Sequence, residues 1–116
     1  MSRVLIAIGV FLIAVPGELA AQGKGIRLWN LTTATMTGFE LSPAGKRDWG
    51  PNQTLNDRDK EVDHDERLRI TGVAAGRYDA KLADKTGRLC IVRNIEVKDG
   101  GVFTIEEKQL TDCEKK

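Results

Sequence analysis

The densest group of side chains that could do chemistry lies between residues 57 and 66. This segment has the sequence DRDKEVDHDE, in which six carboxylates and two basic side chains give a local net charge of −4. Alternating carboxylates could converge on a hard cation such as Ca²⁺, which takes roughly 6–8 oxygen ligands. An EF-hand would need glycine and a carboxylate where Val62 and Leu68 stand. The segment is either a solvated charged loop or a weak cation site. The candidate ligands are Asp57, Asp59, Glu61, Asp63 and Asp65.

Residues that commonly act as nucleophiles and bases are scarce. His64 is the only histidine, and Ser42 is the only serine after residue 21. Ser42 precedes Pro43, at a turn that would direct its hydroxyl to the backbone. Cys90 lies in an apolar run, which raises the pKa of a thiol and makes it a poor nucleophile. We therefore expect neither an enzyme nor a bound cofactor.

The two cysteines are expected to form one disulfide. Cys90 and Cys113 are 23 positions apart, which is wrong for a CxxC redox centre. An even pair in a small exported domain is typical of a structural bridge. Closing a loop of this length stabilises the fold by roughly 3 kcal/mol in the chain-entropy model.

Basic side chains and one tryptophan are the candidates for binding a partner. Residues 67–93 hold seven basic and two acidic side chains, a net charge of +5, and several should project from one outer sheet face. Trp49, before a Gly-Pro turn, is either an exposed recognition aromatic or a loop anchor on the sandwich. The candidate partner-binding residues are Trp49, Arg67, Arg69, Arg77 and Lys81. The partner would be an acidic protein or a component of the cell envelope.

Nucleic acid is not an expected partner. The 18 basic and 17 acidic residues leave the 116-residue chain at a net charge of +1. A nearly neutral chain has no overall field that attracts a polyanion. The basic segment also lacks the interleaved aromatic side chains that stack on bases.

The first 21 residues have the plan of a secretory signal peptide. Arg3 precedes twelve residues without a polar side chain, 4–15, and Pro16-Gly17 ends this run before small residues near Gln22. Twelve apolar residues are too few for a membrane-spanning helix, which needs roughly 20. The sequence therefore predicts a signal helix over 1–21, cleaved to leave a mature domain of 22–116. This product would be periplasmic or secreted, without a stable membrane anchor.

Short segments of strand character recur between turn signals in the mature chain. Alternating apolar and polar residues with Thr, Val, Ile and aromatic side chains favour extended structure. The sequence predicts an all-β fold, an antiparallel β-sandwich of about seven short strands, Ig-like or transthyretin-like. A small β-barrel is the alternative that the same pattern allows. A long charged loop would occupy 42–67. The expected strands are 25–31, 35–41, 67–71, 77–83, 88–97 and 102–106, with the tail from Leu110 returning Cys113 to the sheet.

The alternation also predicts which side chains point into the sandwich. Thr37, Phe39 and Leu41 should share one face, and Trp29 should lie in the core. Arg93-Asn94 interrupts its strand as a β-bulge would. In the strand 77–83, the expected inward residues are Tyr78, Ala80 and Leu82, and the expected outward residues are Arg77, Asp79 and Lys81.

One part of the chain resembles a known hairpin. The sequence ITGVAAGRYD at 70–79, followed by DKTG at 84–87, resembles the "G-x-x-x-G-x-Y" and "D-x-x-G" hairpin of transthyretin-like and carboxypeptidase-regulatory-like modules. Together with LSP at 41–43, WGPN at 49–52 and Cys90, the pattern is similar to small exported bacterial proteins over most of 26–113. The resemblance implies a bacterial periplasmic sandwich and transfers no catalytic residue.

Two functions fit these observations. The first is a non-catalytic periplasmic interaction module that binds a protein or an envelope component. The alternative is a cation-binding accessory protein that uses the carboxylates of 57–66.

Overall fold

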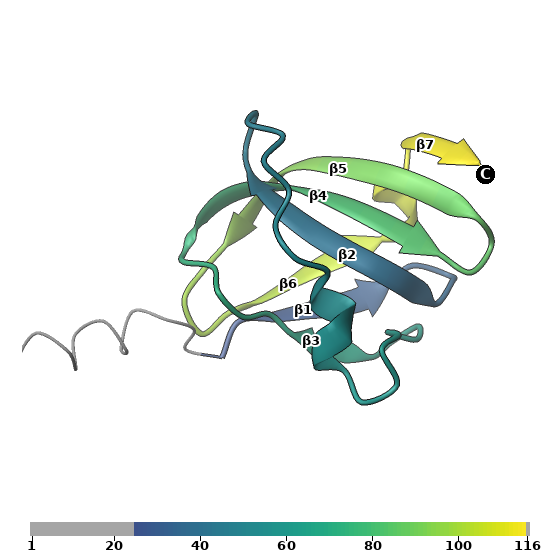
Figure 1. The fold of residues 1–116 in the computed structure, drawn as a ribbon, viewed down its shortest axis with the longest axis horizontal. Coiled ribbons are helices and arrows are strands. Elements are labelled where there is room, and N and C mark those ends of the chain that lie inside the picture. The colour runs from purple at the N-terminus through teal and green to yellow at the C-terminus, as the bar shows by residue number, and fades with distance from the viewer. Residues whose placement is uncertain (1–24, 116) are drawn as a thin grey trace, which may run out of the picture.

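The chain folds into seven β-strands and two short 3₁₀ helices (Figure 1). The computed structural model describes residues 25–115, so the expected signal peptide lies outside the described residues. The strands are β1 (Arg27–Leu31), β2 (Met36–Pro43), β3 (Arg67–Arg69), β4 (Gly76–Asp84), β5 (Arg88–Val97), β6 (Val102–Glu106) and β7 (Asp112–Lys115). The helices are η1 (Gln53–Asn56) and η2 (Glu107–Gln109).

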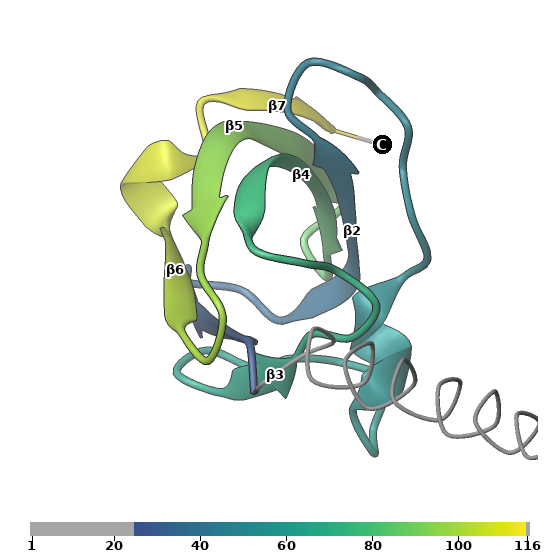
Figure 2. The ribbon, with the colours of Figure 1, turned by 90° about the vertical axis from the view of Figure 1, so that its left-hand side faces the viewer.

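The strands form two sheets, which confirms the predicted all-β sandwich. One sheet has the order β3-β1-β6 and the other β2-β4-β5-β7, and Figure 2 shows the second curving over the first. One pair departs from the antiparallel prediction, since β1 and β6 run parallel. The reason is that the chain changes sheets after β5, and β6 then lies beside β1 instead of its hairpin partner.

The core lies between the two sheets and follows the strand alternation. Leu28 on β1 and Leu82 on β4 are buried, as are Phe39 on β2 and Phe103 on β6. The rings of Phe39 and Phe103 lie 6.1 Å apart between centroids, at a tilted angle. These contacts join the sheets through apolar burial, the main favourable contribution to folding.

Two predictions about inward residues are wrong near the start of the domain. The pairing of β2 with β4 shifts between Met36 and Gly38, so Met36 is buried and Thr37 is exposed. This irregularity breaks the strict period of two on which the prediction depended. Leu28 points into the core, so its neighbour Trp29 points to the outer face of the sheet. The side chain of Trp29 is therefore half-buried.

The bulge predicted at Arg93-Asn94 is confirmed. Tyr78 pairs with Ile95 but Ala80 pairs with Val92, and Asn94 has a φ of 59°. The same bulge overturns the outward prediction for Asp79, which is only 8% exposed. Its carboxylate accepts hydrogen bonds from the backbone N–H groups of Asn94 (2.9 Å) and Gly45 (2.9 Å).

The segment predicted as a long loop begins inside β2 and then follows the free edge of that strand. Gly50 N–H donates to the carbonyl of Leu41 (2.9 Å), and Asn52 Oδ1 accepts from Phe39 N–H (3.0 Å). Farther on, Val62 is buried and forms an antiparallel bridge with Met36. Since these bonds occupy the backbone of an edge strand, the segment protects β2 from pairing with another chain.

The predicted disulfide is present. Cys90 on β5 and Cys113 on β7 are directly paired across the two strands, with their Cα atoms 4.0 Å apart. The bridge therefore fastens the C-terminal strand to the four-stranded sheet, as the sequence predicted.

In residues 25–115, none of the helices has the length and apolar character needed to cross a membrane.

Candidate functional site

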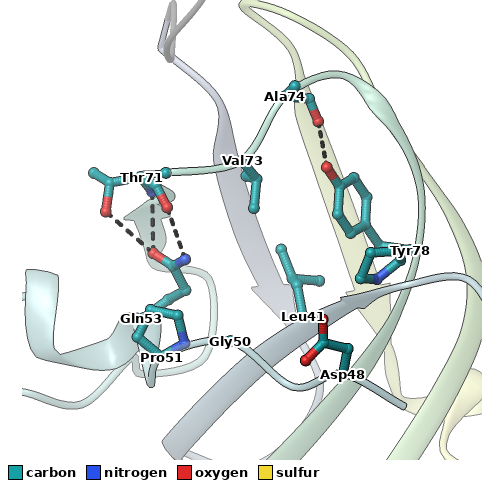
Figure 3. A pocket seen from close by; sticks show the side chains of 11 residues that line it. Leu41, Asp48, Gly50, Pro51, Gln53, Thr71, Val73, Ala74 and Tyr78 are labelled. Carbon is teal, nitrogen blue, oxygen red and sulfur yellow. Dashed lines mark hydrogen bonds between the residues drawn. The ribbon is translucent and has the colours of Figure 1, made fainter. Parts of the chain in front are cut away.

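A surface pocket of about 280 Å³ lies where the end of β2, the segment 48–53 and the β3–β4 connection meet (Figure 3). Its apolar lining comes from three parts of the chain that are far apart in sequence. These residues are Leu41, Pro43, Pro51, Val73, Ala74 and Tyr78. The pocket therefore depends on the fold and could not be assembled by any one of these segments alone.

The wall formed by the β3–β4 connection turns at Gly72 and is fastened at Ala74. Tyr78 donates its hydroxyl hydrogen to the carbonyl of Ala74 (2.7 Å). Gly72 has a φ of 75°, a backbone conformation that glycine adopts without strain, so the chain can turn directly after Thr71. Val73 and Ala74 are held between these two points, and Figure 3 shows both beside Tyr78.

The opposite wall depends on Gln53, a buried polar residue of η1. Its amide pairs with the backbone of Thr71, donating to the carbonyl (2.9 Å) and accepting from the N–H (3.0 Å). Asn56 also donates to the Gln53 carbonyl oxygen (2.8 Å). Because buried amide groups must be hydrogen-bonded, this pairing fixes the position of η1 against the β3–β4 connection.

The charged group of the pocket is the carboxylate of Asp48. The backbone N–H of Asp48 donates to Ser42 Oγ (2.8 Å), which positions the residue beside the end of β2. Its carboxylate takes part in none of the hydrogen bonds or ion pairs between residues 25 and 115. In Figure 3 it faces the same pocket as Leu41 and Tyr78. The pocket thus combines an apolar body with one exposed negative charge.

Trp49 and Lys81, two candidate partner-binding residues, contact each other on the four-stranded sheet. The Lys81 ammonium lies 4.9 Å from the centroid of the Trp49 ring, and it also pairs with Glu40 at 3.5 Å. Trp49 is half-buried, in agreement with a loop anchor, but within the described part of the chain its indole N–H donates to no carbonyl. The Trp49 ring is in cation–π contact with Lys81, which places it against the four-stranded sheet.

A smaller pocket of about 190 Å³ lies beside Trp49 and includes Asp79. Burial alone would raise the pKa of the Asp79 carboxyl. The backbone N–H groups of Gly45 and Asn94 and the charge of Arg93 outweigh burial, so its pKa is lowered. Asp79 therefore stays ionised as a structural acceptor that joins the β2–η1 connection to the bulge.

The predicted basic residues do not share one face, contrary to the expectation. Arg67 and Arg69 belong to β3 in the three-stranded sheet, whereas Lys81 belongs to β4 in the other sheet. Arg77, near the beginning of β4, is exposed and reaches the carbonyl of Asn94 (3.4 Å). A net charge counted along the sequence could not show this division, because β3 and β4 look like one hairpin in the sequence.

The predicted metal-ligating carboxylates make separate contacts. Asp65 accepts from the Trp29 indole (2.9 Å), Asp63 from the Thr35 hydroxyl (3.0 Å), and Glu61 pairs with Lys85 (3.2 Å). Asp57 accepts from the backbone N–H of Asp59 (2.9 Å). Over the described range 25–115, no three His, Cys, Asp or Glu side chains come together in a way that could hold a metal ion.

The groups weighed as nucleophiles and bases also have structural roles. Ser42 Oγ donates to the Pro43 carbonyl (3.0 Å), and His64 Nδ1 lies 2.7 Å from the Thr32 carbonyl oxygen. Cys90 is in the disulfide. These three groups therefore lie in separate networks of contacts.

The pocket itself was not predicted from the sequence. A signal was present in Val73-Ala74-Ala75, because apolar residues at the tip of a connection between two glycines have no place in a strand alternation. Asp48 carried no signal, since one acidic residue in a polar segment is ordinary.

No protein-family model, curated protein or solved structure matches this chain. Fold and site together define a disulfide-linked β-sandwich with a small, mostly apolar surface pocket that contains one carboxylate. The likeness to transthyretin-like modules stays a prediction from the hairpin sequence.

Proposed function

We propose that this protein is an exported, non-catalytic interaction module that takes one basic side chain of a protein partner into the pocket beside Asp48. The observation that carries the proposal is the apolar pocket with a single exposed carboxylate that has no partner between residues 25 and 115. A lysine or arginine side chain has the matching form, an apolar stem that ends in a cation.

The size of the pocket is sufficient for one side chain. Pockets for small molecules have volumes of roughly 300–1,000 Å³, and this pocket lies just below that range. Hot spots of protein interfaces are commonly single side chains in well-packed pockets. Leu41 and Val73 would contact the stem, and the Tyr78 ring is close enough to the same space to contact the cation.

Three further observations support an exported, non-catalytic role. The disulfide between Cys90 and Cys113 is typical of proteins from oxidising compartments, and the apolar run 4–15 is typical of a secretory signal. Ser42 and His64, the groups weighed for catalysis, have structural hydrogen bonds instead. A periplasmic or secreted location fits both the signal and the disulfide.

An NMR titration tests the proposal. N-acetyl-arginine methylamide should shift the backbone amide signals of Gly50, Val73 and Ala74, whereas N-acetyl-glutamate methylamide should not. The Asp48→Asn variant should weaken binding of the arginine probe by about tenfold, because it removes the charge and leaves the shape. Asp99→Asn is the matched control, since Asp99 is an exposed carboxylate in the β5–β6 turn and does not line the pocket.

The proposal is wrong if the arginine probe leaves the pocket amides unchanged. It is equally wrong if Asp48→Asn and Asp99→Asn bind the probe alike. Amide spectra of both variants establish that the fold is intact in each case.

A further inference from the structure

The outer face of the three-stranded sheet carries three arginines in adjacent positions. Arg67 and Arg69 on β3 lie opposite to Trp29 and Arg27 on β1, and all three arginines are exposed. On the other side of β1, Arg27 is paired with Val102, which is 46% exposed. We call Arg27, Arg67, Arg69, Trp29 and Val102 the arginine face.

The register brings two of these charges as close as a sheet allows. Ile70 N–H donates to the carbonyl of Ile26, and Asn30 N–H donates to that of Glu66, both at 3.0 Å. Hydrogen-bonded positions alternate with non-hydrogen-bonded ones in an antiparallel pair, so Arg27 and Arg69 occupy a non-hydrogen-bonded position. Side chains are closest there, and like charges directly opposite are unfavourable.

Three basic side chains of the four-stranded sheet are paired with carboxylates. On the four-stranded sheet, Lys81 pairs with Glu40, Arg88 with Asp84, and Arg93 with Asp112, whereas Arg77 on β4 contacts the Asn94 carbonyl and belongs to no ion pair of residues 25–115. None of the ion pairs among residues 25–115 includes an arginine of the arginine face. No ion pair of the described chain therefore offsets the repulsion between Arg27 and Arg69, and the carboxylate bonded to this face, Asp65, accepts from Trp29 beside Arg67.

The third guanidinium is held in place by an aromatic ring. The Arg67 guanidinium carbon lies 4.2 Å from the centroid of the Trp29 ring, and the Trp29 indole N–H donates to Asp65 (2.9 Å). A ring fixed in this way limits the freedom of Arg67 before any partner arrives. Pre-organised arginines that can bind a carboxylate with two hydrogen bonds suit an interface.

We propose that the arginine face binds an extended acidic segment of a partner protein, whose carboxylates pair with the pre-organised Arg67 and with Arg27 and Arg69. The uncompensated positive charge provides the complementarity, and Val102 beside Arg27 provides apolar contact. Arginine and tryptophan are also the residue types most enriched at interface hot spots. This site is separate from the pocket at Asp48, where the sign of the charge is opposite, and neither proposal depends on the other.

A hexaglutamate peptide is the probe for this face. It should shift backbone amide signals on β1 and β3 and bind more weakly as salt is added. The double variant Arg27→Gln, Arg69→Gln should weaken binding by about tenfold or more. Arg47→Gln, Arg58→Gln removes the same charge from two exposed positions elsewhere and should bind like the unmodified protein.

A stability measurement separates loss of binding from loss of fold. Arg27→Gln alone should keep or raise the melting temperature at low salt, because it removes the repulsion from Arg69. A large drop in melting temperature would contradict the repulsion on which the argument depends. Equal loss of peptide binding in both double variants would overturn the site.

Two competing anions complete the test. Inorganic phosphate and vesicles of phosphatidylcholine with phosphatidylglycerol should each bind more weakly than hexaglutamate. Tighter binding of the vesicles would assign the face to a lipid surface, and tighter binding of phosphate would assign it to a phosphorylated ligand. Either outcome would overturn the proposal that the arginine face binds an acidic protein segment.

Discussion

Glu107 connects three parts of the chain through one carboxylate. It accepts hydrogen bonds from Arg88 Nη1 (2.7 Å) and from the backbone N–H (3.0 Å) and hydroxyl (3.1 Å) of Thr33. The hydrogen bond from Arg88, followed by the one from the Thr33 backbone, lowers the pKa of Glu107 to about 2. Arg88 also pairs with Asp84 at 2.9 Å, so η2 is tied to the β4–β5 hairpin.

The lowered pKa of Glu107 predicts a pH-dependent contribution to stability. A carboxyl group whose pKa falls on folding stabilises the fold above its ordinary pKa of 4.5, and this stabilisation is lost as pH falls toward about 2. Glu107→Gln should lower the free energy of unfolding at pH 7 by on the order of 1 kcal/mol, because the side chain is 41% exposed and screened by solvent. Urea unfolding at several pH values measures the difference.

The pH series supplies its own control. The difference in the free energy of unfolding between the unmodified protein and Glu107→Gln should shrink steadily below pH 4.5. Glu96→Gln, at an exposed residue of β5, should produce almost no gap at any pH. A gap for Glu107→Gln that stays constant from pH 7 to pH 3 would exclude this role of the carboxylate.

Sequence reasoning at the residue scale succeeded where one period dominates a segment. Leu82 and Ala80 on β4 are inward as predicted, and so are Phe39 and Leu41 on β2. It failed where a bulge changes the period, as at Thr37, or where a carboxylate such as Asp79 can bond two backbone N–H groups from distant segments. Such bonds depend on the fold, so no local pattern indicates them.

At the scale of elements, the acidic segment 57–66 behaves as a connection with several separate attachments. Asp65 holds the Trp29 indole, Asp63 holds the Thr35 hydroxyl, and Glu61 pairs with Lys85. The crowding of carboxylates in this segment affects the pKa of Glu66. The backbone N–H of Asp63 lowers the pKa of Glu66, but burial and the Asp57 and Asp63 carboxylates outweigh this bond, so the pKa is raised.

These separate attachments predict a weak response to calcium. Millimolar Ca²⁺ should leave the melting temperature unchanged, because a ligand that does not bind the folded state cannot stabilise it. Asp59→Asn should change stability by less than about 0.5 kcal/mol, whereas Asp65→Ala should cost about 1 kcal/mol through the lost bond to Trp29. Thermal unfolding with and without Ca²⁺ measures both effects. A calcium-dependent rise that disappears in Asp59→Asn would favour the cation-binding alternative.

Most elements were predictable, but their arrangement was not. Turn residues such as Asp84-Lys85-Thr86-Gly87 marked the β4–β5 hairpin, and the pair of cysteines indicated the β5–β7 contact. The sequence could not show that β3 leaves the sheet of β4, or that β6 runs parallel to β1. Both features follow from how the apolar faces of distant strands pack together. Because β3 and β4 belong to different sheets, Arg67 and Arg69 are separated from Lys81.

At the scale of the whole molecule, a net charge of +1 hides surface regions of opposite charge, two of which adjoin where Asp65 accepts from Trp29. The arginine face is positive, the segment 57–66 is negative, and the pocket presents Asp48 at another part of the surface. A partner with charges of both signs could use these regions together. The molecule is therefore described better by its separate surfaces than by its overall charge.

The most direct test of the central claim places a photoreactive benzophenone side chain at Ala74, an exposed residue of the pocket wall, in the native cell. We predict a covalent adduct with one protein partner, at a partner segment that contains lysine or arginine, and loss of this adduct when Asp48→Asn is added. The same group at exposed Thr111, outside the pocket lining, should not give this adduct. An adduct that persists unchanged with Asp48→Asn, or that forms equally from Thr111, would contradict the account.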